Sequence, residues 1–73
     1  QINGRSMDVE ILTWQARTKK RITLVQLAKL TGISKSTLNN IENSKTSPTL
    51  MELEVIAKAL GVRITDLFDS DYK

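Results

Sequence analysis

Residues 23–42 of the chain read TLVQLAKLTGISKSTLNNIE, and this stretch decides the fold. Apolar residues recur at near-helical spacing before and after the corner Thr31-Gly32-Ile33: Leu27, Ala28, Leu30, Leu38 and Ile41. This spacing predicts two short amphipathic helices. Gly32 supplies the positive φ that a compact helix–helix corner needs, and the small side chain of Ala28 lets the two helices approach. We therefore expect the second helix to cross the first and to point outward.

The exposed front of this second helix is polar and contains no acid. Its apolar back is Leu38 and Ile41, and its front is made of Lys35, Ser36, Thr37, Asn39, Asn40 and Asn43. Asparagine presents a donor and an acceptor together to adenine, lysine donates to guanine, and a threonine methyl packs on thymine. The front therefore favours a helix that lies in the major groove of DNA. The alternative is a solvated helix end, but two asparagines in mid-helix are unusual because asparagine forms helices poorly.

Capping signals divide the rest of the chain into helices. Thr23 with Gln26 and Thr49 with Glu52 form capping boxes, and Ser34 is a natural N-cap. Gly61 fits the stop of the fourth helix, whose buried stripe is predicted as Leu50, Leu53, Ile56, Ala57 and Leu60. In the first helix, Val9, Leu12, Thr13 and Ala16 share a face. The predicted helices are 8–19, one starting at 24, 35–43, one starting at 50, and 63–68, with no strand.

Composition excludes several classes of function. The 73 residues leave room for one domain, and they include no cysteine and no histidine. Thiolate metal sites, disulfides and the commonest general base are therefore absent, and we expect neither a cofactor nor a metal. The acid pairs Asp8/Glu10 and Glu52/Glu54 are two residues apart, so their side chains diverge on a helix. We expect no enzyme, no membrane span and a cytoplasmic protein.

The positive charge is concentrated on the segment that holds the predicted reading helix. Residues 17–45 contain seven bases and one acid, Glu42, whereas the whole chain carries a net charge of +3. A basic segment of this kind is the footprint of a protein that binds a polyanion. An ordinary solvated basic face is the alternative.

Residues 9–68 resemble the Cro/CI-type (phage-repressor-like, XRE family) helix-turn-helix domain. The positions that carry the resemblance are Ala28, Gly32, Ile33, Leu38, Ile41, Glu42-Asn43, Pro48 and the run 56–62, IAKALGV. The resemblance implies an all-α, lambda-repressor-like domain of five helices, with the helix-turn-helix at the second and third. It also implies double-stranded operator DNA as the partner, usually bound by a homodimer.

The resemblance and the side-chain chemistry together assign roles to individual residues. The positions that match the family's base readers are Lys35, Ser36, Asn39 and Asn40. We expect phosphate contacts from Thr23, Gln26, Ser34, Thr37, Lys45 and Thr49. Arg17 and Glu42 match the family's structural pair, which ties the first helix to the end of the third. The chain departs from the family pattern at Leu24, where glutamine is common, at Ser44, where glycine is common, and at Arg63, where serine is common.

The ends of the chain and some apolar residues leave alternatives open. We expect residues 1–6 to be a cloning remnant or disordered, residues 7–68 to form the DNA-binding domain and residues 69–73 to be a flexible tail. Trp14 could be a subunit contact or could cover the edge of the core, and the same choice applies to Ile64, Leu67, Phe68 and Tyr72. The rival functions are an antitoxin that binds a toxin protein and autoregulates its operator, and an interaction domain that has lost DNA binding and contacts a regulator.

Overall fold

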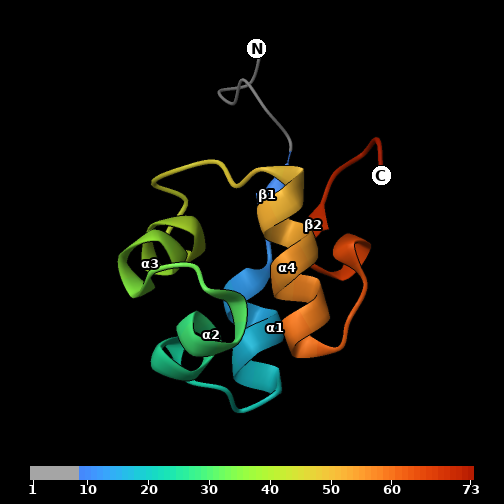
Figure 1. The fold of residues 1–73 in the computed structure, drawn as a ribbon. Coiled ribbons are helices and arrows are strands. Elements are labelled where there is room, and N and C mark those ends of the chain that lie inside the picture. Colours follow the sequence, from blue (N-terminus) through green and yellow to red (C-terminus); the bar gives the residue numbers. More distant parts are fainter. Residues whose placement is uncertain (1–8) are drawn as a thin grey trace.

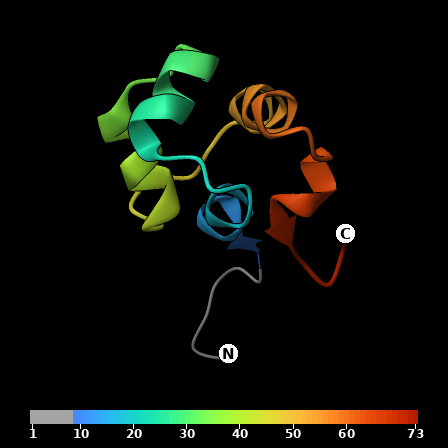
Figure 2. The ribbon, with the colours of Figure 1, turned by 90° about the horizontal axis from the view of Figure 1, so that it is seen from below.

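The computed structural model describes residues 9–73, and four α-helices make up most of this part (Figure 1). The helices are α1 (Thr13–Lys19), α2 (Leu24–Thr31), α3 (Lys35–Glu42) and α4 (Leu50–Leu60). A 3-10 turn, η1 (Ile64–Asp66), follows α4, and two short strands, β1 (Glu10–Ile11) and β2 (Phe68–Asp69), flank the helices. Figures 1 and 2 show α2 and α3 on one side of the molecule, η1 and β2 on the other, and α1 and α4 between them.

Local capping produces the helix boundaries that the sequence predicts for α2, α3 and α4. The side chain of Thr23 accepts from the backbone N–H of Gln26, and the side chain of Gln26 accepts from the N–H of Thr23. Thr49 and Glu52 make the same reciprocal pair at the start of α4. Ser34 caps α3 by accepting from the N–H of Thr37. These caps satisfy backbone donors that the first turn of a helix leaves without partners.

Two glycines end helices in the left-handed region of backbone conformation. Gly32 has φ +75° at the end of α2, and Gly61 has φ +69° at the end of α4. A Cβ added to Gly32 would meet nothing within 4 Å, so the corner requires glycine for its φ and not for space. The N–H of Gly32 donates to the carbonyl of Ala28, which closes the last turn of α2 before the chain enters α3.

The core lies where α2, α3 and α4 meet. It is built from side chains that are at most 5% exposed: Leu27, Leu38, Leu53, Ile56, Ala57, Leu60 and Leu67. Leu38 is 1% exposed on the inner side of α3, and the same helix buries Ile41 to the same extent. The inner face of α3 is therefore fixed by packing, which leaves its polar face turned outward.

The first helix starts later than the sequence predicts. A helix from residue 8 and the absence of any strand were expected, but α1 begins at Thr13 and Glu10–Ile11 form β1. β1 pairs antiparallel with β2, with Glu10 opposite Asp69 and Ile11 opposite Phe68. The N–H of Leu12 then donates to the carbonyl of Leu67. This pairing holds the backbone extended, and Leu12 offers α1 no capping side chain.

Three further expectations about α4 and the segment that follows it also fail. The fifth helix predicted at 63–68 is only the 3-10 turn Ile64–Asp66, because the chain then leaves for β2. Asp69, the expected first residue of a flexible tail, belongs to β2. Leu50, which was expected in the buried stripe of α4, is 71% exposed because it lies in the first turn, beyond the edge of the core. Asp8 and the expected remnant at 1–6 fall outside the described residues.

Candidate nucleic-acid interface

The outer face of α3 brings together the residues that were expected to read bases. Lys35, Ser36 and Asn39 are exposed, and Asn40 is half-buried. Ser36 and Asn40 are one turn apart, so they lie above each other on the face opposite the buried Leu38 and Ile41. The face therefore offers amides and a hydroxyl, with an ammonium at its edge, and these are groups that can hydrogen-bond to base edges in the major groove.

Asn43 belongs to this face although it was not among the predicted base readers. It follows Asn39 by one turn, is exposed and caps the end of α3. Its Nδ2 donates to the backbone carbonyl of Asn39 at 3.0 Å and to Oδ1 of Asn39 at 3.2 Å. This contact orients the Asn39 amide. The repeat of asparagine four residues later was the signal in the sequence that pointed to Asn43.

The threonine caps of α2 and α4 retain a donor for phosphate. In each cap the hydroxyl oxygen accepts a backbone N–H, at 3.1 Å for Thr23 and 3.0 Å for Thr49. A hydroxyl has one donor besides its acceptor sites, so both caps can still donate to an anion. Oε1 of Gln26 is engaged with the N–H of Thr23, which leaves the Gln26 amide nitrogen as its donor for phosphate.

Ser34 and Thr37 act as one unit at the start of α3. The Ser34 hydroxyl donates to Oγ1 of Thr37 at 2.9 Å while it accepts from the Thr37 N–H. The proton of the Thr37 hydroxyl is therefore the one available to a ligand. Ser34 and Thr37 were both predicted to contact phosphate. The geometry leaves the free hydroxyl proton on Thr37 and uses Ser34 as the cap of α3.

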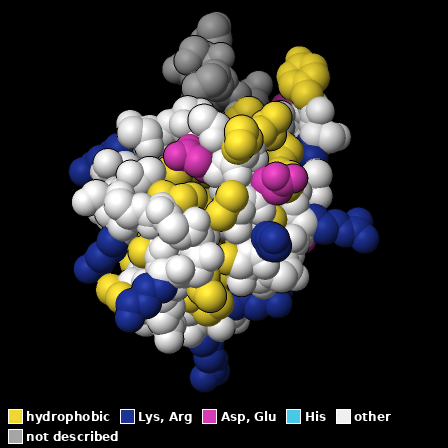
Figure 3. All heavy atoms as spheres, viewed as in Figure 1, with side chains coloured by type: hydrophobic (Ala, Val, Ile, Leu, Met, Phe, Trp, Pro, Cys, Tyr) yellow, Lys and Arg dark blue, Asp and Glu magenta, His cyan; other side chains and the backbone are white. Residues whose placement is uncertain are grey.

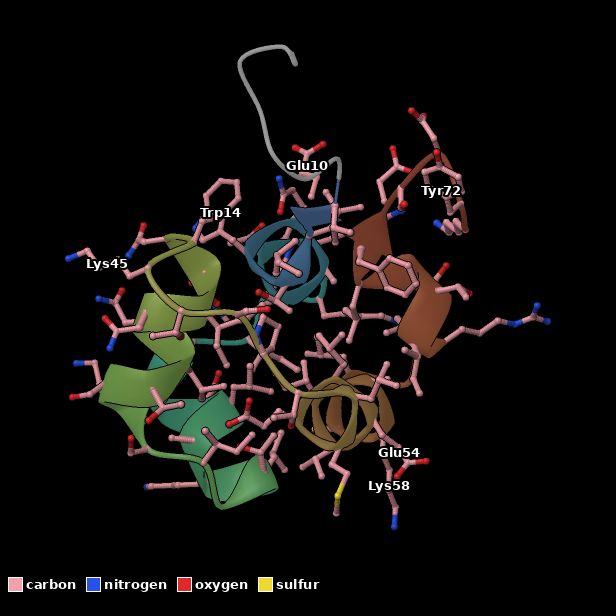
Figure 4. The ribbon with its side chains drawn as sticks, turned by 90° about the horizontal axis from the view of Figure 1, so that it is seen from above. Glu10, Trp14, Lys45, Glu54, Lys58 and Tyr72 are labelled. Atoms are coloured by element: carbon pink, nitrogen blue, oxygen red, sulfur yellow. The ribbon has the colours of Figure 1, made fainter. Side chains whose placement is uncertain are left out.

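The turn after α3 presents Lys45 on a conformation that costs energy. Ser44 has φ +58°, a left-handed value that favours glycine. The N–H of Ser44 donates to the carbonyl of Ile41, and the N–H of Lys45 donates to the carbonyl of Asn40. These two bonds hold the turn, and the Lys45 side chain extends from it into solvent (Figure 4). The family commonly has glycine at this position, and the serine of this chain adopts the positive φ in its place.

Arg17 links α1 to the end of α3. Its Nε lies 2.6 Å from Oε2 of Glu42, and its Nη2 lies 3.1 Å from Oε1, so the ion pair is bidentate. Its Nη1 donates to the carbonyl of Ile22 at 2.8 Å. The side chains of Arg17 and Glu42 are only 12% and 5% exposed. The pair thus fixes the end of α3 and removes the acid of residues 17–45 from the outer surface.

Charge is unevenly distributed over the described surface. Figure 3 shows Lys and Arg side chains along the side where α3 and α2 lie, whereas over α4 carboxylates and basic side chains lie together. With Arg17 engaged by Glu42, the exposed bases of residues 17–45 are Lys19, Lys20, Arg21, Lys29, Lys35 and Lys45. A polyanion would therefore meet the helix-turn-helix side with the least electrostatic opposition.

The apolar side chains that could be either subunit contacts or part of the core differ widely in exposure. Trp14 is 52% exposed and lies on the same side of the molecule as Lys45 in Figure 4. Leu67 is fully buried in the core, whereas Tyr72 is 92% exposed.

Within residues 9–73, no three His, Cys, Asp or Glu side chains gather as metal ligands, and no helix is long and apolar enough to cross a bilayer.

Comparison with known proteins supports the same arrangement. A sequence model of the helix-turn-helix family matches residues 15–67, from within α1 to the residue after η1. The immunity repressor protein of Bacillus phage phi105 is 39% identical over 49 residues, which cover 67% of this chain and 34% of that protein. The transcriptional regulator SinR of Bacillus subtilis is 35% identical over 60 residues, which cover 81% of this chain and 54% of SinR.

A third relative is similar in size to the chain. The uncharacterized HTH-type transcriptional regulator MJ0272 of Methanocaldococcus jannaschii is 40% identical over 52 residues, covering 71% of this chain and 79% of that protein. By contrast, the chain spans about a third of the phi105 repressor and about half of SinR. The similarity to the two longer relatives therefore concerns their helix-turn-helix part.

Proposed function

Because the chain belongs to the helix-turn-helix family, in its Cro/CI-type branch, we propose that it is a sequence-specific regulator of transcription that binds double-stranded operator DNA. In this proposal α3 lies in the major groove, and the protein acts in a repressor-like manner as a homodimer. The observation that carries it is the acid-free outer face of α3, held in place by a buried core on one side and by the Arg17–Glu42 pair at its end.

Each part of the interface has its own task in this proposal. Lys35, Ser36, Asn39 and Asn40 contact base edges, and the orientation of the Asn39 amide is set by Asn43. The phosphate contacts are Thr23, Gln26, Thr37, Lys45 and Thr49, and Ser34, also expected to contact phosphate, instead caps α3 and holds the Thr37 hydroxyl. The starts of α2 and α4 add the partial positive charge of helix N-termini to the threonine hydroxyls. Phosphate contacts set the register of the protein on the duplex, while base contacts select the sequence.

The names of the relatives favour a repressor-like function over the antitoxin alternative. The phi105 protein is called an immunity repressor, and SinR is called a transcriptional regulator. Binding of operator DNA also explains the basic side of the domain, which an interaction domain without DNA binding would not need.

Two single substitutions test the division between base reading and phosphate contact. Asn40→Ala should cost about 1–3 kcal/mol on a duplex selected by the wild-type protein and much less on random DNA, since base-edge contacts carry the sequence information. Lys45→Ala should weaken binding to every duplex about equally and should reduce the salt dependence of log K by about one unit. Equal losses on selected and random DNA for Asn40→Ala would contradict the assignment of α3.

A further inference from the structure

The only tryptophan of the chain, Trp14, lies half exposed at the edge of the candidate nucleic-acid interface. Its side chain is 52% exposed in the first turn of α1, whereas the neighbouring Thr13 is 1% exposed. An indole has a large apolar ring and one N–H, which can donate a hydrogen bond but cannot accept one. A half-covered ring of this kind suits a binding surface that is apolar in one part and accepts hydrogen bonds in another.

Helical spacing places Trp14 next to the end of α3. It precedes Arg17 by three residues, so the two side chains lie on the same face of α1. Arg17 contacts Glu42, the last residue of α3, at 2.6 and 3.1 Å. The face of α1 that carries Trp14 is therefore turned toward the end of α3. Figure 4 shows the Trp14 ring pointing away from the core, next to the loop between α3 and α4 in this view.

The Arg17–Glu42 pair also fixes the distance between Trp14 and the reading helix. The side chains of the pair are only 12% and 5% exposed, and the pair joins α1 to α3 directly. Trp14 is one helical turn before Arg17, and its carbonyl accepts from the Thr18 hydroxyl at 2.9 Å. A duplex held by α3 would therefore meet Trp14 at a defined position.

The charges near Trp14 indicate where a DNA strand would leave the protein. Lys45 lies on one side of it in Figure 4, and the exposed acid Glu10 lies on the other. Glu42, the only acid of residues 17–45, is already paired with Arg17. Phosphates are attracted by the lysine and repelled by the exposed acid. The backbone of a bound duplex should therefore pass Lys45 and make its last contact at Trp14.

We propose that Trp14 contacts the sugar–phosphate backbone of the bound DNA, next to the phosphate that Lys45 contacts. Its N–H donates to a phosphate oxygen, and its ring covers the neighbouring deoxyribose, so both parts of the indole find a partner. The inference rests on the proposed function, because it requires α3 to lie in the major groove. It adds to that function a backbone contact from α1 that carries no charge.

A neutral donor should behave differently from a lysine when salt is raised. Binding of a lysine to phosphate releases a condensed counterion, and this release is the origin of the salt dependence. An indole N–H releases none, so losing it should lower the affinity without changing the slope of log K against log salt. A backbone contact also carries no direct sequence information, so the loss should be the same on all duplexes.

Trp14→Phe and Tyr72→Phe form a matched pair of variants. Each keeps an aromatic ring, and each removes one polar group, the indole N–H or the phenolic O–H. Both residues are exposed, at 52% and 92%, and Figure 4 shows them on opposite sides of the domain. Their binding is compared with that of the wild type on a selected duplex with one half-site and on random duplexes, over a range of salt concentrations.

Trp14→Phe should weaken binding to selected and random duplexes alike by about tenfold, the loss expected when a hydrogen bond to a charged acceptor is removed. Its salt slope and its unfolding free energy should stay those of the wild type, and Tyr72→Phe should bind as the wild type does. In the wild-type complex, DNA should shield the tryptophan from acrylamide. Quenching of tryptophan fluorescence reports this directly, because Trp14 is the only source of the signal.

A scan with methylphosphonates, which replace single phosphates by neutral groups, identifies the acceptor. At one position the wild-type protein should lose affinity and Trp14→Phe should lose much less, because the same hydrogen bond can be removed only once. This non-additive result would not arise if Trp14 only stabilised the fold.

The outcomes separate this inference from the proposed function. Wild-type affinity in Trp14→Phe, or acrylamide quenching that DNA does not reduce, would overturn the contact and leave DNA binding intact. A loss seen only on duplexes with two half-sites would make Trp14 a subunit contact and would also overturn it. If the wild-type protein binds no duplex above background, the proposed function fails and takes this inference with it.

Discussion

Replacing Glu42 by leucine should show that the Arg17–Glu42 pair holds α3 in place. The substitution leaves the Arg17 guanidinium, whose side chain is 12% exposed, without the carboxylate that contacts it at 2.6 and 3.1 Å. Removing one partner of a buried ion pair costs about 3–5 kcal/mol. A domain of this length has an unfolding free energy of only about 4–11 kcal/mol. Glu42→Leu should therefore lower Tm by more than about 12 °C.

The double variant Arg17→Met with Glu42→Leu is the control that identifies the cause. Replacing both charges by apolar groups of similar volume is often neutral or stabilising, so the main remaining cost is the Ile22 carbonyl that loses its donor, about 1–3 kcal/mol. The double variant should be more stable than Glu42→Leu alone in urea and thermal unfolding. The coupling would be refuted if the losses of unfolding free energy in Arg17→Met and Glu42→Leu, measured separately, simply added up to the loss in the double variant. A change of base preference in Glu42→Leu without loss of stability would also contradict the reasoning.

Three further predictions concern single features of the described chain. Ser44→Gly should raise the unfolding free energy by about 0.5–1 kcal/mol because it relieves the φ of +58°, whereas Ser44→Ala should give no gain in the same urea titration. Thr13→Val should raise Tm, because the Oγ1 of this buried residue has no hydrogen-bond partner and an unpaired buried hydroxyl costs about 1–3 kcal/mol. Thr13→Ser keeps the hydroxyl, loses a methyl and should lower Tm, so a rise in both variants would contradict this reason. Binding to DNA should weaken with salt at a slope of about −4 to −5 per subunit if four to six phosphates are neutralised, and a flat titration would remove the electrostatic contribution.

The helices that the sequence predicts well are those whose ends depend on neighbouring residues. Thr23 with Gln26, Ser34, and Thr49 with Glu52 make hydrogen bonds within three residues, so residue type and spacing are enough to locate the starts of α2, α3 and α4. Gly32 and Gly61 end their helices by a backbone property of glycine alone.

The start of α1 and the end of the chain could not be predicted in this way. β1 and β2 come from opposite ends of the described chain, and their two-residue pairing is visible only once the helices have brought them together. The same pairing shortens the fifth helix to the 3-10 turn Ile64–Asp66, since Phe68 must enter the strand. Short strands carry little local signal, because periodicity needs a longer run of residues.

For the candidate site, the sequence predicts which face of α3 points outward better than it predicts which hydroxyl groups remain free to donate to phosphate. Leu38 and Ile41 fix which side of the helix is buried, so the outward position of Ser36, Asn39 and their neighbours follows from helical geometry. Whether a hydroxyl caps a helix or remains free for phosphate depends on hydrogen bonds such as the one from Ser34 to Thr37. Residue type and spacing alone do not determine the direction of such a bond.

The most direct test of DNA reading by α3 is a selection from a library of randomised double-stranded DNA, read out by sequencing the bound fraction. The wild-type protein should enrich a motif made of two related half-sites whose centres are about 34–36 Å apart, one helical turn of DNA. Asn40→Ala, carried through the same selection, should enrich a motif that has lost its preference at one position in each half-site. A folded wild-type protein that enriches no sequence over the input would contradict the account.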